Sequence, residues 1–500
     1  MNGHQVSKRA AFLLLIAAAF LQSGCVTATS LVSGNKRLYK YSWAQEVQIG
    51  QEADPSIVAE YGLYDDAATA AYVDSVGQYV LRFSHARSPS APAEVQQTQF
   101  FFRVLDSPVV NAFALPGGYI YVTRGLLAHL ENEAQLAVVI GHEIGHVVGR
   151  HASIRGLNQT LSQALVVGGA VGGQVLMGGD AASTILQGGS SVAQGFLMSY
   201  GRDDERESDD LGLEYGVQAG YNVEPAADFF RSLKRLSDRA GQRTPSLLST
   251  HPDPGEREAT IHRMAREWEK THPPGQVGRD KYLRHVDGLI AGENPRNGFV
   301  RNSVFYQPDM AFQFPVPESY EVINQPQQVI LVASDQASMI RFYLESTAST
   351  AREAAENFGS QEGLTVVQSG LGSAYGLPAQ FVVVDAPDES GNVTRGRAQF
   401  IQYNGQVFAF LGLAAQANYA ARERGFIQAM QGFAPLRDAA ILGIQPSRVD
   451  VRALPSPAVF SSLFPSDGSA NFSLEELAIL NQVELSARIS AGTKVKHIRQ

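Results

Sequence analysis

The sequence predicts an α+β protein with a mainly helical part first and a mixed part after it, and three patterns support this prediction. The apolar run at 131–140 contains no Gly or Pro, as expected of a buried helix. After residue 310, alternating apolar and polar residues indicate strands interrupted by two helical stretches. Ser473 and Glu476 have the spacing of a capping box, which predicts a short helix near the C-terminus. A chain of 500 residues is too long for one ordinary domain, so several domains are expected.

The N-terminus has the pattern of an export signal. Lys8 and Arg9 precede an apolar run at 10–21, which is too short to cross a bilayer as a permanent helix. Residues 1–24 are therefore predicted to be a signal peptide that directs the chain to the periplasm.

Cys25 is the only cysteine of the chain, so no intramolecular disulfide can form. With the apolar run before it, Cys25 resembles the lipidated cysteine of bacterial lipoproteins, although Gln22 stands where leucine is usual. The resemblance implies cleavage before Cys25, a lipid on its sulfur, a tether at 25–40 and anchorage to the outer membrane. Signal cleavage after Ala28 is the alternative, and it would release a soluble periplasmic protein.

A strand is predicted at 119–122, after the tight turn formed by residues 116–118. We expect it to be the edge strand of a small sheet, because such an edge can bind an extended polypeptide by adding a strand. An ordinary core strand is the alternative. The expected substrate strand includes Asn111, Ala112, Phe113, Gly118, Tyr119 and Tyr121.

His142 and His146 lie four residues apart on the predicted helix, so both imidazoles can ligate one metal ion. Glu143 follows the first histidine and can act as the general base for a water molecule. This HExxH pattern is typical of zinc peptidases. The alternative is a surface helix with two incidental histidines, but so apolar a helix is expected to be buried, where imidazoles need partners.

A zinc peptidase needs a third protein ligand and one open position. His151 is one candidate, but on a continuing helix it would lie about 140° from His146 around the axis, so a supporting or packing role is favoured. Glu205 and Asp209 share one helical face, and they suit a His₂Glu site in which the aspartate orients a ligand histidine. An acidic, solvated helix start is the alternative for this pair.

Three motifs together resemble the gluzincin zinc metallopeptidases of the CAAX prenyl protease, HtpX and BepA type, and the resemblance covers about residues 40 to 270. The motifs are NAFALPGG at 111–118, GHEIGHVVGRH at 141–151 and RDDERESDD at 202–210. The resemblance implies one zinc ion per chain, with His142, His146 and Glu205 as ligands, Glu143 as general base and Asp209 as a supporting catalytic acid. Ser208 and Gly201 replace the usual Ala and Ser, and neither is a ligand position.

His251 lies in a loop stiffened by Pro252 and Pro254. Two functional roles are open for it: a latch that occupies the open zinc position, or a group that stabilises the oxyanion. The alternative is a surface or capping histidine.

The motifs place the peptidase domain at 41–275, a linker at 276–310 and an α+β accessory domain at 311–440. The accessory domain contains no catalytic constellation, so it is interpreted as a substrate-delivery or partner-binding domain, with structural support as the alternative. Its expected elements are strands at 328–332 and 380–384, a hairpin at 400–410 turning on Asn404-Gly405, and helices at 351–358 and 417–433. Residues 446–500 resemble a degenerate LysM module, which implies that they bind peptidoglycan.

The sequence therefore predicts a zinc endopeptidase of the bacterial envelope that cleaves misfolded or misassembled proteins. A net charge of −9 over 500 residues offers no basic surface for nucleic acid. Two other functions are open. One is a chaperone-like assembly factor with a latched or silent zinc site, and the other is a cell-wall-binding protein whose peptidase domain is mainly structural.

Overall fold

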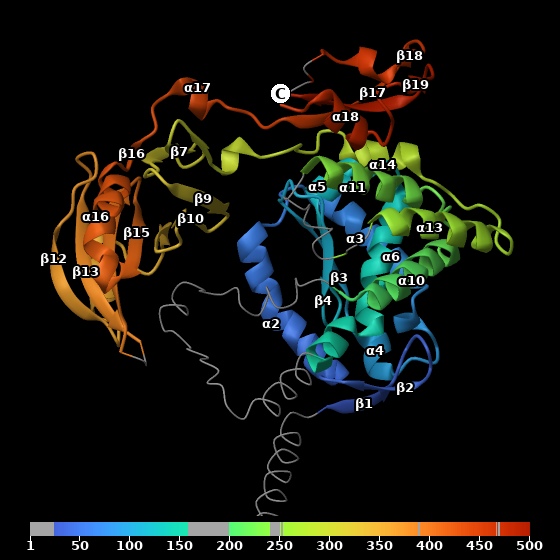
Figure 1. Cartoon of the computed structure of the whole chain (residues 1–500), viewed down its shortest axis with the longest axis horizontal. Helices are drawn as coiled ribbons and strands as arrows, with labels where there is room; N and C mark the ends of the chain where they lie inside the picture. The colour runs from blue at the N-terminus through green and yellow to red at the C-terminus, as the bar shows by residue number, and fades with distance from the viewer. Residues whose placement is uncertain are drawn as a thin grey trace, which may run out of the picture.

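The computed structural model has an α+β fold, as the sequence predicts, with a helical part and a β-rich part side by side (Figure 1). The C-terminal segment returns to the helical part and packs on it. The predicted signal peptide lies outside the described residues. The described residues are 25–158, 200–240, 251, 254–388, 391–466, 468 and 471–500.

The helical part begins with an antiparallel hairpin that leads into the first long helix. Ser42 and Gln45 form a capping box, which fixes the start of this helix. Asp66 caps the next helix by accepting from Thr69 N. The elements are β1 (Val26–Thr29), β2 (Lys36–Tyr39), α2 (Trp43–Tyr61), α3 (Ala67–Leu81), η1 (His85–Arg87) and α4 (Ala93–Gln97).

A three-stranded sheet follows, with strands β3 (Phe101–Leu105), β4 (Ala112–Leu115) and β5 (Tyr119–Thr123) in the order β3-β5-β4. The prediction of an edge strand at 119–122 is wrong, because β5 pairs with β3 on one side and with β4 on the other. The turn at 116–118 folds β4 and β5 into a hairpin, and β3, which precedes β4 in the chain, pairs with the other edge of β5. Among the described strands, β4 pairs only with β5, so the outer edge of this sheet beside the helices belongs to β4.

Two helices cross closely and carry the residues of the HExxH and acidic motifs. Gly141 of α6 (Glu133–Gly149) lies against Gly212 of α10 (Arg202–Gln218), and a Cβ at Gly212 would lie 2.9 Å from the main-chain N of His142. The small residues therefore let the two backbones approach and bring together the faces that carry the motif residues. The other helices of this part are α5 (Arg124–His129), α11 (Ala226–Ala240), α13 (Pro254–Glu269) and α14 (Arg279–Val286).

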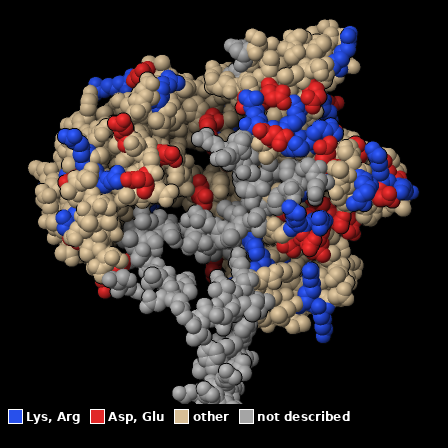
Figure 2. All heavy atoms as spheres, in the orientation of Figure 1, with Lys and Arg blue, Asp and Glu red and all other residues tan. Residues whose placement is uncertain are grey.

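The surface of α11 and α13 carries charged side chains of both signs. Figure 2 shows basic and acidic side chains interspersed over the helical part on the face that it draws. Several of them form ion pairs, such as Arg231 with Asp228 and Glu258, and Lys234 with Asp238. Within the described residues, no helix is long and apolar enough to cross a membrane.

The segment at 276–310, expected to be a linker, contains structured elements. Helix α14 packs against α3 and α6, while β6 and β7 join a four-stranded sheet of order β16-β8-β7-β6. This sheet connects the helical part to the β-rich part. Its elements are η2 (Pro295–Asn297), β6 (Phe299–Arg301), β7 (Val304–Gln307), β8 (Phe312–Pro315) and β16 (Ala434–Pro435).

The β-rich part is an antiparallel seven-stranded sheet with one helix on each face, and the predicted strands, helices and hairpin are confirmed. The hairpin turns on Asn404 and Gly405, which have φ of 49° and 75°. Phe408 and Phe410 pack with α16, whereas Ala409 and Leu411 pack with α15. The elements in sheet order are β12 (Thr365–Leu371), β13 (Ala379–Pro387), β14 (Val393–Tyr403), β15 (Gln406–Ala415), β11 (Ser338–Glu345), β10 (Gln328–Ala333) and β9 (Tyr320–Gln325), with helices α15 (Ala351–Gly359) and α16 (Gln416–Gln431).

In the C-terminal segment, the predicted helix lies between β17 and β20 in the sequence, and these two strands pair with each other. The capping box of Ser473 and Glu476 starts that helix, as predicted. Lys496 is buried, donates to the carbonyls of Ala128 and Leu130 at 2.7 and 2.9 Å, and so fixes this segment to the helical part. The elements are α17 (Ala439–Leu442), β17 (Arg448–Ala453), β18 (Ala458–Val459), η3 (Phe460–Leu463), α18 (Leu474–Leu480), β19 (Arg488–Ile489) and β20 (Lys494–Arg499).

Candidate metal centre

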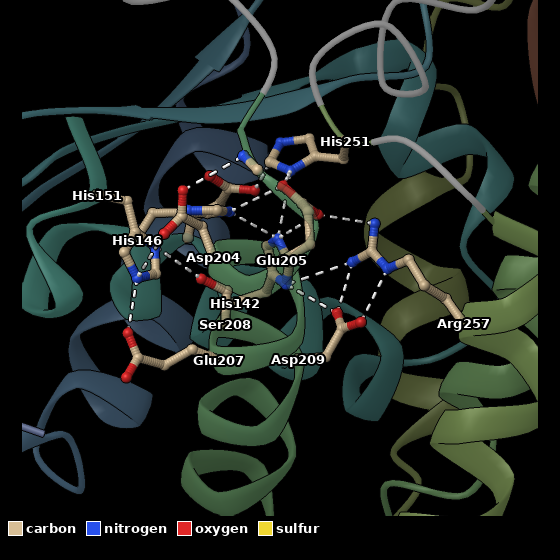
Figure 3. Close-up of polar contacts among 12 residues, drawn as sticks. His142, His146, His151, Asp204, Glu205, Glu207, Ser208, Asp209, His251 and Arg257 are labelled. Carbon is tan, nitrogen blue, oxygen red and sulfur yellow. Dashed lines mark hydrogen bonds and ion pairs between the residues drawn. The ribbon is translucent and has the colours of Figure 1, made fainter. Parts of the chain in front are cut away.

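Four buried side chains from three segments point toward one another (Figure 3). His142 and His146 come from α6, Glu205 from the first turns of α10, and His251 from the residues before α13. One potential ligand atom of each lies within 4.8 Å of the others. The Nε2 atoms of His142 and His146 are 2.9 Å apart, and His251 Nδ1 is 2.8 Å from Glu205 Oε1. The four residues thus offer three imidazoles and one carboxylate to a single ion.

The chemistry of these residues fits a zinc ion. Three nitrogen donors and one oxygen donor match the ligands and the coordination number that zinc prefers. The buried carboxyl groups of Glu143, Glu205 and Asp209 outnumber the one buried guanidinium of the site, that of Arg257. A bound cation would add positive charge beside them. Glu143 Oε2 and His251 Nε2 also form no hydrogen bond with the described residues.

The electrostatics of the candidate ligands favour their metal-binding forms. Burial, and then the neighbouring His142, lower the pKa of His146 well below its ordinary value, which keeps its imidazole neutral and able to ligate. Burial by itself would raise the pKa of Glu205, but His251 and Arg257 hold it below its ordinary value. Glu205 is therefore a carboxylate and His146 a neutral imidazole at neutral pH.

Asp209 lies one helical turn after Glu205 and contacts the other ring nitrogen of His142, with Oδ1 at 3.0 Å from Nδ1. Burial opposes its ionisation, but Arg257 and His142 hold the pKa of Asp209 well below its usual range. An ionised Asp209 can only accept, so His142 donates from Nδ1 and keeps Nε2 free for a metal.

Arg257 of α13 is a residue of this site that the sequence motifs did not indicate. Its Nε and Nη2 donate to Asp209 at 2.9 and 2.5 Å, and its Nη1 lies 3.1 Å from Glu205 Oε2. The signal in the sequence was periodicity, because Arg257 precedes the buried Ile261 and Ala265 at intervals of four residues.

His151 supports the site without joining the four-residue cluster, in agreement with the expected supporting role. Helix α6 ends at Gly149, and the chain then reverses so that His151 Nδ1 lies 2.9 Å from His146 Nδ1. The other ring nitrogen of His151 contacts Glu207 at 2.8 Å. Glu207 therefore points away from the cluster, on the opposite side of α10 from Asp209.

Glu143 is buried beside the cluster, with Oε1 at 3.6 Å from His251 Nε2. Burial raises the pKa of its carboxyl above the ordinary value, which suits a group that must take and release a proton.

Three of the residues expected to form the substrate strand, Phe113, Tyr119 and Tyr121, pack against α2, whereas Ala112 belongs to the main core. Tyr121 is fully buried and donates from its hydroxyl to Asp54, while Phe113 and Tyr119 lie in the same small core. The part of this region that reaches the site is instead the end of β4. A small pocket there is lined by Glu46, Ala114, Leu115, Pro116, His146, Val147, Arg150, Ala152 and Tyr200.

The geometry defines a candidate metal centre with a buried glutamate beside it. Residues 69–265 match the model of peptidase family M48.

The similar relatives are also peptidases. The chain is 30% identical over 228 residues to the β-barrel assembly-enhancing protease of Escherichia coli (strain K12), which covers 45% of this chain and 44% of the relative. It is 31% identical over 172 residues to the mitochondrial metalloendopeptidase OMA1 of Arabidopsis thaliana, which covers 34% and 33%. The chain thus spans less than half the length of these relatives. The solution structure of PsbP from Synechocystis sp. PCC 6803 aligns with 26% of this chain and 91% of its own, at 11% identity and a TM-score of 0.22, a likeness too low to support an argument.

We predict that Asp209→Asn weakens zinc binding by about 10- to 100-fold, because the amide no longer fixes the proton of His142 on Nδ1. Competition with a chromogenic chelator measures the dissociation constant. Asp210→Asn is the matched control, because Asp210 is the exposed neighbour on the same helix. Equal zinc affinity of the two variants would contradict the orienting role of Asp209.

Proposed function

We propose that this protein is a zinc-dependent endopeptidase of the bacterial envelope that cleaves misfolded or misassembled proteins. The observation that carries the proposal is the buried carboxyl of Glu143 beside the cluster of His142, His146 and Glu205. The match to the M48 family and the similarity to named metalloendopeptidases support the same chemistry.

In the proposed reaction, Glu143 takes a proton from the attacking water and returns it to the leaving amine. Its burial supports this role, since a raised pKa brings the carboxyl closer to neutral pH. Zinc, when held by His142, His146 and Glu205, supplies a Lewis acid that polarises the scissile carbonyl and acidifies water. Asp209 and His151 hold the two histidines in orientation.

The outer edge of β4 is the proposed site for an extended substrate. Its backbone pairs with β5 on one side only among the described strands, and its end reaches the pocket beside His146. A polypeptide added along this edge would be recognised mainly through its main chain, with little sequence selectivity. Such recognition suits unfolded segments of many proteins, and one relative is named for enhancing β-barrel assembly.

His251 is proposed to latch the site. With His142, His146 and Glu205 it supplies a fourth donor, and four protein ligands complete the tetrahedral shell of zinc. A catalytic site needs one position open for water, so His251 must leave before cleavage. The same closed arrangement is what favours the second candidate function, a chaperone-like assembly factor with a silent zinc site.

The sequence also leads to three linked proposals: a location in the bacterial envelope, a lipid anchor in the outer membrane and contact with peptidoglycan. A lipid on Cys25, which is partly exposed at the start of the described chain, would hold the protein on the outer membrane from the periplasmic side. The strand–helix–strand arrangement of β17, α18 and β20 supports a LysM-like segment. Retention of the full chain on purified peptidoglycan tests that contact.

Glu143→Gln is predicted to lower cleavage of an unfolded model substrate such as casein by at least about 100-fold, because the amide cannot accept a proton. Zinc content measured by atomic absorption is expected to stay at one ion per chain, since Glu143 is not one of the proposed ligands. Cleavage that survives the substitution would refute the mechanism. Restored growth of a deletion strain by the inactive variant would favour the chaperone function.

His251→Ala is predicted to raise the rate of casein cleavage severalfold, because the variant cannot occupy the fourth ligand position. His262→Ala is the control, because His262 lies on α13 and pairs with Glu224 away from the cluster. A lower rate would instead assign His251 to stabilising the oxyanion, and an unchanged rate would exclude both roles.

Mass spectrometry of the mature protein is predicted to find an N-terminus at Cys25 carrying a lipid, and Cys25→Ser is predicted to move the protein from the membrane to the soluble periplasmic fraction. An unmodified N-terminus at Thr29 would exclude the anchor.

A further inference from the structure

The helix that carries the two motif histidines ends at an unusual residue. Arg150 follows Gly149 as the C-cap of α6, and its φ of 58° and ψ of 37° lie in the left-handed region. Glycine is the usual residue for this conformation, because a side chain makes it costly. Arg150 is also almost completely buried. A buried arginine in a conformation that favours glycine indicates that its side chain has a role of its own.

The side-chain partners of Arg150 come from the N-terminal segment, before the part of the chain that matches the M48 model. Arg150 Nε donates to Glu46 Oε1 at 2.9 Å, and its Nη2 donates to the carbonyl of Tyr41 at 2.5 Å. The guanidinium also lies 3.9 Å from the ring centroid of the fully buried Tyr39. Tyr41 N donates in turn to Ser153 Oγ, on the residues that follow the turn. We call these five residues the Arg150 clamp.

The turn that the clamp holds decides where His151 lies. A continuing helix would carry His151 away from His146, whereas the left-handed residue turns it back until the two Nδ1 atoms are 2.9 Å apart. The fit is tight, because a Cβ at Gly149 would lie 2.4 Å from His151 Nε2. Figure 3 shows His151 between His146 and Glu207, which is the arrangement that orients the ring of His146.

We infer that Arg150 is a positioning residue for the metal centre: through the turn at 150 the N-terminal segment holds His151 against His146, and so sets the orientation of that ligand. The inference rests on the proposed function, because His146 is placed there as a zinc ligand. If the inference holds, residues 39–46 are needed for the metal centre, although they precede residues 69–265, which match the family model.

The test separates this role from that of an ordinary helix end. The double variant Arg150→Gly/Glu46→Gln gives the turn its preferred residue and removes both charges together, so no unpaired buried charge remains. If Arg150 only ended the helix, this variant would bind zinc as the unmodified protein does. Tyr39→Leu is a second variant, which removes the aromatic face under the guanidinium and leaves the ion pair. The control is Arg235→Ala/Glu475→Gln, which deletes an arginine–glutamate pair between α11 and α18.

Zinc affinity of the full chain is measured by chelator competition, and the visible spectrum of bound Co²⁺ reports ligand geometry, both at a temperature at which circular dichroism shows the variant folded. The double variant is expected to raise the zinc dissociation constant at least about tenfold and to shift the Co²⁺ bands. Tyr39→Leu is expected to raise the zinc dissociation constant and to shift the Co²⁺ bands in the same direction, but by smaller amounts. The control is expected to stay within twofold of the unmodified protein.

Zinc affinity within twofold of the unmodified protein for both clamp variants would overturn the inference. If the double variant does not fold, the zinc affinity of Tyr39→Leu alone tests the inference. Loss of folding in both variants would also overturn the inference, because the clamp would then determine the fold and not the orientation of His146. Failure of the proposed function is distinguishable, since the unmodified protein would then bind no zinc or cleave no substrate.

Discussion

The close crossing of α6 and α10 is the constraint on which the rest of the structure depends. Gly141 and Gly212 let the two backbones touch, and Gly145 meets Ser208 one turn further along. Because the crossing is so tight, ionisable side chains from both helices are buried together with little room for water. Burying them is costly unless each is paired, so the surrounding elements must supply counter-charges and hydrogen bonds. Arg257 and the N-terminal segment meet this requirement from two sides of the crossing.

The C-terminal segment meets a similar requirement at the other end of α6. Lys496 is buried against Glu131 and the carbonyls just before the helix, and Gln482 donates to the carbonyl of His129. Hydrophobic residues of this segment belong to the same core cluster as α6. The start of the helix that bears His142 is therefore fixed by residues more than 300 positions later in the chain.

Local patterns in the sequence predicted the elements well because they depend on neighbouring residues. The helix around HEIGH, the shared face of Glu205 and Asp209, and the hairpin at Asn404-Gly405 all follow from spacing or turn chemistry. The position of β5 in its sheet was missed because β3 pairs with it from a segment earlier in the chain, and a single sequence shows no pairing. Arg257 and Arg150 were missed for a related reason. Periodicity places Arg257 on the buried face of its helix, but no local pattern shows that distant carboxylates will pair with an arginine.

The two sides of the metal centre are held differently, and this difference bears on how the proposed latch can open. On the N-terminal side, the contacts reach His146 through a tight backbone turn and a buried ion pair. On the other side, His251 and Arg257 both reach Glu205 from the same stretch of chain. Arg257 also binds Asp209 through two nitrogens, so it can keep α13 in place while His251 moves away. Opening the latch therefore needs only a displacement of His251 from Glu205. The carboxylates of Glu205 and Asp209 stay paired with Arg257, and His142 and His146 keep the orientation that a zinc ion requires.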